Sequence, residues 1–95
     1  MASKDAYDQR LEAQMAEWQA KIDLLKARAE RSEAENRIAY HEQVEALQQR
    51  REEIKAKLEE LRDSGEDAWA DIRSGTESAW KALDAAISRA LQRFR

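Results

Sequence analysis

Residues 66–94 read EDAWADIRSGTESAWKALDAAISRALQRF, and their apolar side chains return every eleven residues. The phases of this repeat are Trp69, Trp80 and Leu91; Ala68, Ala79 and Ala90; Ile72, Leu83 and Phe94; and Thr76 and Ile87. Eleven residues are about three turns of α-helix, at roughly 3.67 residues per turn, so the phases stay on one face. The repeat therefore predicts an amphipathic helix over residues 66–94 with one continuous apolar face.

A turn over residues 63–65 precedes this helix. Gly65 can adopt positive φ and so end a preceding helix, and Ser64 with Asp67 three residues later resembles a capping box. Gly75 lies inside the repeat, where it costs about 1 kcal/mol relative to alanine. Because the eleven-residue phase continues past it, we expect one helix that runs through Gly75.

Residues 4–62 carry a heptad pattern instead. Large apolar residues are spaced three and four apart at Met15, Trp18, Ile22 and Leu25, and the spacing returns at Val44, Leu47, Ile54, Leu58 and Leu61, with Arg51 at the position between Leu47 and Ile54. Between Asn36 and Leu47 the steps are four, four and three, a stutter that relaxes left-handed supercoiling. The pattern predicts one coiled-coil helix over 4–62, about 90 Å long at 1.5 Å per residue.

The middle of this pattern is weak. Ala29, Ser32 and Asn36 are small or polar where leucine is expected in a heptad. Two interpretations remain open: a polar core position that sets register and oligomeric state, or a solvent-exposed stretch with no close partner.

The predicted fold class is all-α: a long helix followed by a shorter antiparallel helix, because a short loop favours antiparallel neighbours. Residues 66–94 would then pack along residues 34–62. Five large apolar residues stay uncovered in this hairpin: Leu11, Met15, Trp18, Ile22 and Leu25. An uncovered stripe of this kind marks an interaction site. We therefore expect a homo-oligomer, favouring a dimer that forms an elongated helical bundle, with parallel and antiparallel long helices both open.

Composition limits the classes of partner. The chain has 95 residues, 39% of them charged, a net charge of −3, no cysteine and no proline. Nearly every basic residue has an acidic neighbour one helical turn away, which is typical of a solvated mixed-charge face and not of nucleic-acid binding. No apolar run approaches the ~18 residues of a membrane span, and the first twenty residues lack the apolar core of a signal peptide. We expect a cytoplasmic protein.

Candidates for chemistry are few. His41 is the only histidine, and the di-iron motif Glu-x-x-His would need an acid at position 38, where Ile38 stands. Adjacent carboxylates such as Glu52 and Glu53 point about 100° apart on a helix, so they do not form a paired acid and base. We expect no catalytic residue, no cofactor and no metal site, and therefore a non-enzymatic protein.

Two functions remain open. The first is a structural or interaction protein that self-associates through the stripe of residues 11–25. The alternative is a reversible lipid-surface binder that uses the apolar face of residues 66–94. That face, which either packs in the hairpin or meets lipid, consists of Trp69, Ile72, Trp80, Leu83, Ile87, Leu91 and Phe94. The core role is favoured, since the polar side of this helix is balanced in charge and attracts anionic lipid weakly.

Four stretches resemble a known family. They are Met1-Ala2-Ser3-Lys4-Asp5-Ala6-Tyr7, Ala16-Glu17-Trp18 with Lys21-Ile22-Asp23, Tyr40-His41-Glu42-Gln43-Val44-Glu45, and Ser64-Gly65-Glu66-Asp67-Ala68-Trp69-Ala70-Asp71. Together they make the chain similar to short bacterial coiled-coil proteins associated with stress responses, described as apolipoprotein-like for their eleven-residue repeats. The resemblance implies a bacterial cytoplasmic helical protein without a defined molecular activity. It carries over no functional residue.

Overall fold

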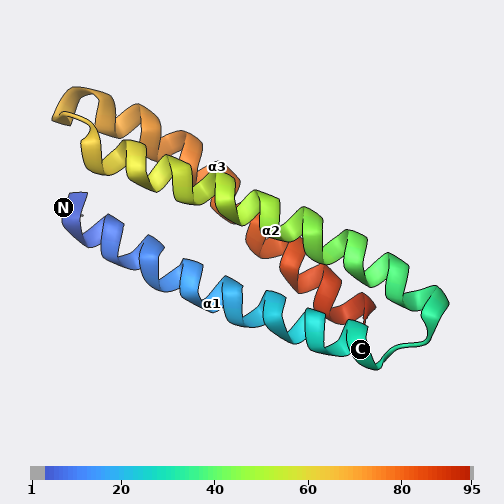
Figure 1. The fold of residues 1–95 in the computed structure, drawn as a ribbon. Helices are drawn as coiled ribbons and strands as arrows, with labels where there is room; N and C mark the ends of the chain where they lie inside the picture. The colour runs from blue at the N-terminus through green and yellow to red at the C-terminus, as the bar shows by residue number, and fades with distance from the viewer. Residues whose placement is uncertain (1–3, 95) are drawn as a thin grey trace.

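The computed structural model describes residues 4–94, which form three helices and no strand. These are α1 (Lys4–Arg31), α2 (Ala34–Asp63) and α3 (Glu66–Arg93). They run up, down and up as a single bundle that measures 50 × 17 × 17 Å (Figure 1). The all-α class is confirmed, but the chain has three helices where the sequence predicted two.

The predicted long helix over 4–62 is wrong because the chain reverses at Ser32 and Glu33. Ser32 closes α1 by donating from its backbone N–H and its hydroxyl to the carbonyl of Ala29, at 3.2 and 2.7 Å. Glu33 is extended, with φ −66° and ψ 155°, and stands at the N-cap of α2. The weak heptad segment contains this turn: residues 33–38, Asn36 among them, are exposed, as the second interpretation expected, whereas Ala29 is buried at the end of α1.

Burial explains why the chain reverses here. A continuous helix would leave the apolar stripe of residues 11–25 in water, whereas the reversal brings it against α2 and α3. Burying large apolar side chains contributes about 1.5–3 kcal/mol each, while ending a helix at Ser32 gives up only a few backbone hydrogen bonds. One chain thus forms by itself the elongated helical bundle that the sequence was expected to form as a dimer.

The core runs the whole length of the bundle. Tyr7, Leu58 and Leu61 are buried near one end, and Tyr40 and Phe94 pack ring to ring at the other with centroids 4.1 Å apart. The two large apolar side chains that remain exposed among the described residues are Leu24 and Ile38. Most large apolar side chains of residues 4–94 are therefore buried, and a further set is half-buried against this core.

The second turn lies where the sequence placed it, but its chemistry differs. The hydroxyl of Ser64 donates to the carbonyl of Leu61 at 2.8 Å, so Ser64 closes α2 and does not cap α3. The N-cap of α3 is Gly65, which is extended at φ −77° and has no side-chain cap. The predicted capping box and the positive φ of Gly65 are therefore wrong. α3 continues through Gly75 without interruption.

Polar contacts fasten the helix ends. The ammonium of Lys4 donates to the carbonyls of Arg62 and Ser64 at 3.0 and 2.7 Å, where α2 ends. At the opposite end, the guanidinium of Arg28 donates to the carbonyls of Leu91 and Phe94 at 3.2 and 3.1 Å. Both cations satisfy carbonyls that a helix C-terminus leaves without partners.

A bidentate salt bridge joins α1 to α2 at the end of the bundle where Lys4 lies. The guanidinium of Arg62 donates to both carboxylate oxygens of Asp8, at 2.7 and 2.9 Å. These hydrogen bonds hold the pKa of Asp8 below its ordinary value and raise that of Arg62.

Gly75→Ala should raise the free energy of unfolding by about 0.5–1 kcal/mol, because alanine favours the helical state and a Cβ at this position meets no atom within 4 Å. Urea denaturation of both proteins measures it. Gly65→Ala is the matched control: it has equal room but stands at an N-cap, where alanine is poor, and should give no gain. Equal gains at both sites would contradict the helical account.

Asp8→Asn should destabilise the bundle at neutral pH, and the difference from the unmutated chain should vanish in acid. Because the folded pKa of Asp8 is depressed, its contribution is complete above its ordinary value of 3.8 and is lost as pH falls through the lower folded pKa. Unfolding in urea at a series of pH values measures this. Asp5→Asn controls for loss of a negative charge near the start of α1. A difference that persists in strong acid would refute the role of the ion pair.

Candidate interaction surfaces

The stripe predicted for self-association lies inside the bundle. Leu11, Trp18, Ile22 and Leu25 are fully buried and Met15 is 5% exposed. Trp18 also donates its indole N–H to the carboxylate of Asp84 in α3 at 3.2 Å. The expectation that this stripe is uncovered is wrong, because the reversal at residues 32–33 turns α2 and α3 onto it.

The apolar face of α3 is divided into two halves. Leu83, Ile87 and Phe94 are buried, and Leu91 is half-buried, so the C-terminal half is core. In the N-terminal half Trp69, Ile72 and Trp80 are only half-buried, and they pack against the core from outside. Thr76 is buried between them and donates its hydroxyl to the carbonyl of Ile72 at 2.7 Å.

An aromatic cluster joins these tryptophans to α1, whereas the sequence placed them on the apolar face of α2. Tyr7 lies 6.0 Å from the rings of both Trp69 and Trp80, and Trp18 lies 5.9 Å from Trp80. The guanidinium of Arg73 stacks 5.2 Å from Trp69 and 5.4 Å from Tyr7. Edge-on ring pairs and cations over ring faces are both attractive, so this cluster holds the first half of α3 to α1.

Two polar atoms of the cluster are buried without a hydrogen-bond partner in the structure: the hydroxyl of Tyr7 and the indole N–H of Trp69. Burial raises the pKa of Tyr7 above 10.0, the charge of Glu77 raises it further, and Arg73 and Arg10 oppose the shift. Buried polar groups normally have hydrogen-bond partners. This end of the bundle therefore has the less complete hydrogen bonding of the two.

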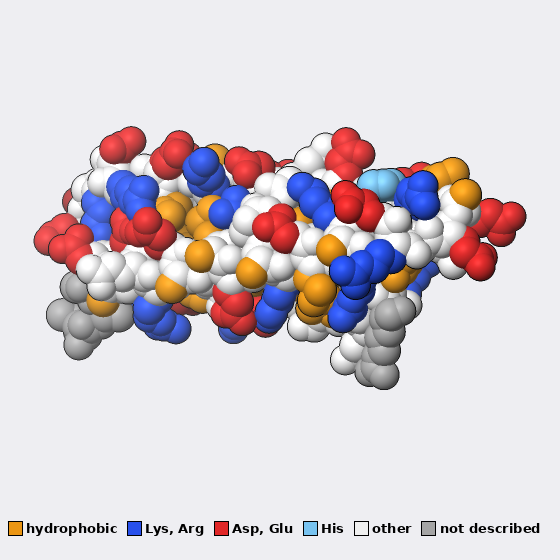
Figure 2. Space-filling model, turned by 60° about the horizontal axis from the view of Figure 1, so that its bottom comes forward, with side chains coloured by type: hydrophobic (Ala, Val, Ile, Leu, Met, Phe, Trp, Pro, Cys, Tyr) orange, Lys and Arg blue, Asp and Glu red, His pale blue; other side chains and the backbone are white. Residues whose placement is uncertain are grey.

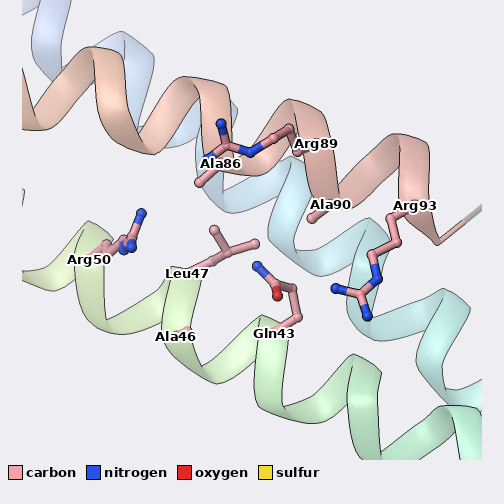
Figure 3. A pocket seen from close by; sticks show the side chains of 8 residues that line it. All are labelled: Gln43, Ala46, Leu47, Arg50, Ala86, Arg89, Ala90 and Arg93. Atoms are coloured by element: carbon pink, nitrogen blue, oxygen red, sulfur yellow. The ribbon is translucent and has the colours of Figure 1, made fainter.

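A groove of about 460 Å³ between α2 and α3 carries three arginines (Figure 3). Arg50 rises from α2 toward α3, Arg93 reaches from α3 toward α2, and Arg89 lies along α3 (Figure 3). Gln43 stands between them on α2, with its amide directed into the groove. The remaining lining residues are apolar and mostly small: Ala46, Leu47, Ala86 and Ala90.

No carboxylate lines this arginine groove, and none of its three guanidiniums is ion-paired with a described residue. By contrast, acidic and basic side chains intermingle over the face seen in Figure 2. The groove was not predicted, because comparing each basic residue with its neighbours on the same helix does not show which arginines of different helices come together. The available signal was the segment 85–95, which holds three arginines and no acid.

Other candidate chemistry is not brought together. His41 is exposed. Within residues 4–94, no group of three or more His, Asp or Glu side chains is placed to hold a metal ion. None of the helices over these residues has an apolar stretch of the length that crossing a bilayer requires.

Comparison with protein-family models, curated proteins and solved structures found no match to this chain.

Tyr7→Phe should leave the free energy of unfolding unchanged or raise it by up to about 1 kcal/mol, since it removes a desolvated hydroxyl without a partner. Asp84→Ala should instead lower it by about 1–3 kcal/mol, because it strands the buried indole N–H of Trp18. Urea denaturation of both variants measures the contrast. A Tyr7→Phe variant as unstable as Asp84→Ala would show that the Tyr7 hydroxyl has a partner in solution.

Proposed function

We propose that this protein is a non-enzymatic interaction protein that acts as a folded single-chain bundle and meets its partner through its polar outer surface. The observation that carries the proposal is the complete burial of the residue 11–25 stripe, Trp18 included, within one chain. A chain that buries its own apolar stripe needs no second copy to fold. The surface that remains for a partner is mainly charged. In the arginine groove, positive charge has no acidic side chain lining the groove to neutralise it.

The shifted titrations fit this proposal. The pKa of Asp8 moves because Arg62 binds it, and that of Tyr7 moves mainly because the ring is buried. Both groups join helices to one another. Shifted pKa values occur at catalytic sites, but structural ion pairs and burial produce them as well. Here an ion pair accounts for the shift of Asp8 and burial for that of Tyr7, so neither shift calls for a catalytic role.

Self-association stays a prediction, now without the uncovered stripe on which it rested. A role in a bacterial stress response likewise rests on the resemblance of four sequence stretches. Both belong to the proposal as expectations.

A specific observation favours lipid-surface binding as the second candidate. The N-terminal half of α3 leaves Trp69, Ile72 and Trp80 half-buried, with the indole N–H of Trp69 unpaired. Tryptophan favours a membrane interface because its ring sits in an apolar layer while its N–H meets polar groups. Swinging α3 out at Ser64 and Gly65 would place its whole eleven-residue face on such a surface.

The test is molecular mass by light scattering together with tryptophan emission, in buffer and with anionic phosphatidylglycerol vesicles. The proposal expects a monomer of 11.0 kDa with blue-shifted emission that vesicles do not change. A dimeric mass at micromolar concentration would contradict the single-chain form. A vesicle-induced change in emission that Trp69→Ala with Trp80→Ala abolishes would establish the lipid-binding candidate in its place.

A further inference from the structure

We propose that the arginine groove between α2 and α3 is a binding site for a phosphate-type oxyanion, with an extended polyphosphate group as the best-fitting ligand. This inference deepens the proposed function: it rests on the bundle staying folded when it binds, and it names the chemistry of what is bound.

The geometry of the groove suits an elongated anion. Arg89 and Arg93 are four residues apart, so they project from the same face of α3, about 6 Å apart along its axis at 1.5 Å per residue. On the opposite wall, Gln43 and Arg50 are seven residues apart, about 10.5 Å along α2. Donors thus lie on both walls over a length that exceeds a single phosphate and suits a chain of two or three.

Small side chains on both walls create the space of the groove. Ala46 on α2 faces Ala86 and Ala90 on α3, and Leu47 forms a buried apolar floor. A hollow of about 460 Å³ over such a floor brings the guanidiniums close to a ligand partly shielded from water. Guanidinium groups present paired N–H donors that match phosphate oxygens, and such charge-assisted hydrogen bonds are the strong ones.

Structural roles do not use up these arginines. The usual reason for arginine near a helix C-terminus is to satisfy its last carbonyls. In this bundle Arg28 of α1 already donates to the carbonyls of Leu91 and Phe94. Arg89 and Arg93 are exposed and hold no ion pair with the described residues. The guanidinium of Arg93 lies 5.1 Å from the centroid of the Phe94 ring, a contact that uses its flat face and leaves its N–H donors for a ligand.

One acid lies nearby and provides a control. Glu53 shares the adjoining hollow with Arg50, and no ion pair joins them. Its charge should weaken anion binding without blocking it. Glu53→Gln should therefore bind more tightly than the unmutated protein.

The experiment is calorimetric titration of the full chain with sodium tripolyphosphate at low salt, with inorganic phosphate as the short probe. We expect saturable binding of one tripolyphosphate per chain, and weaker binding of phosphate. Arg93→Gln and Arg50→Gln should each weaken binding by about tenfold or more, as expected for a lost hydrogen bond to a charged group. Lys81→Gln removes the same charge from α3 outside the groove and should change affinity far less.

Vesicles distinguish a lipid headgroup from a free polyphosphate as the source of the anion. Phosphatidylcholine vesicles with and without phosphatidic acid are mixed with the protein and floated. Flotation that requires phosphatidic acid, and that Arg50→Gln and Arg93→Gln abolish, would assign the headgroup. Tripolyphosphate binding without flotation would assign a free ligand. Both outcomes support the site.

Two results would overturn the inference. One is that neither tripolyphosphate nor phosphate binds saturably. The other is that Lys81→Gln weakens tripolyphosphate binding as much as Arg93→Gln does, which would show diffuse electrostatic attraction. Circular dichroism of each variant checks that the bundle is intact. A folded monomer that binds no oxyanion would refute this site and leave the proposed function standing. A chain that unfolds or dimerises in buffer would refute the proposed function itself.

Discussion

The burial of the α1 stripe against α2 and α3 is the contact on which the rest of this molecule depends. Trp18 lies at its centre, fully buried, with its N–H bound to Asp84. Each large apolar side chain taken out of water contributes about 1.5–3 kcal/mol, and small domains have only about 5–15 kcal/mol of net stability. For a chain of 95 residues, the reversal that covers this stripe therefore supplies a large share of the net stability. The turns, the end contacts and the exposed charges are arranged around that requirement.

The two ends of the bundle differ in how completely their buried groups are packed and hydrogen-bonded. At one end Tyr40 stacks on Phe94, and Arg28 closes α3. At the other, Tyr7 and Trp69 keep polar atoms without partners. The second end also relies on rings beneath Arg73, which attract less strongly than close apolar packing. Local opening of a bundle begins where contacts are least satisfied. The first half of α3 is therefore the segment that separates most easily from the core.

Periodicity predicted helix content and the face of each helix correctly, because side-chain spacing reports local geometry. It did not predict the reversal at Ser32 and Glu33, since no glycine or proline marks it and a serine inside a heptad is an ordinary substitution. Whether the helix ends there depends on tertiary packing, because the reversal is what brings α2 and α3 against residues 11–25. The spacing of side chains along one helix does not report such contacts. The arginine groove was missed for a related reason. Arg50 is separated from Arg89 by 39 positions, and only the antiparallel packing of α2 and α3 brings them together.

The same reversal links the fold to the proposed binding surface. Because α1 runs antiparallel to α2, its C-terminal end lies beside the C-terminal end of α3, where Arg28 satisfies the last carbonyls (Figure 1). Had residues 4–62 stayed one helix, Arg28 would lie about 50 Å from Arg62 along its axis, far from α3 of its own chain. The carbonyls of Leu91 and Phe94 would then lack this donor and would depend on water or on other side chains. With Arg28 supplied from α1, Arg89 and Arg93 hold no ion pair with the described residues, and Arg93 only rests on the ring of Phe94. Their availability is thus a consequence of the three-helix topology, and no local sequence feature dictates it.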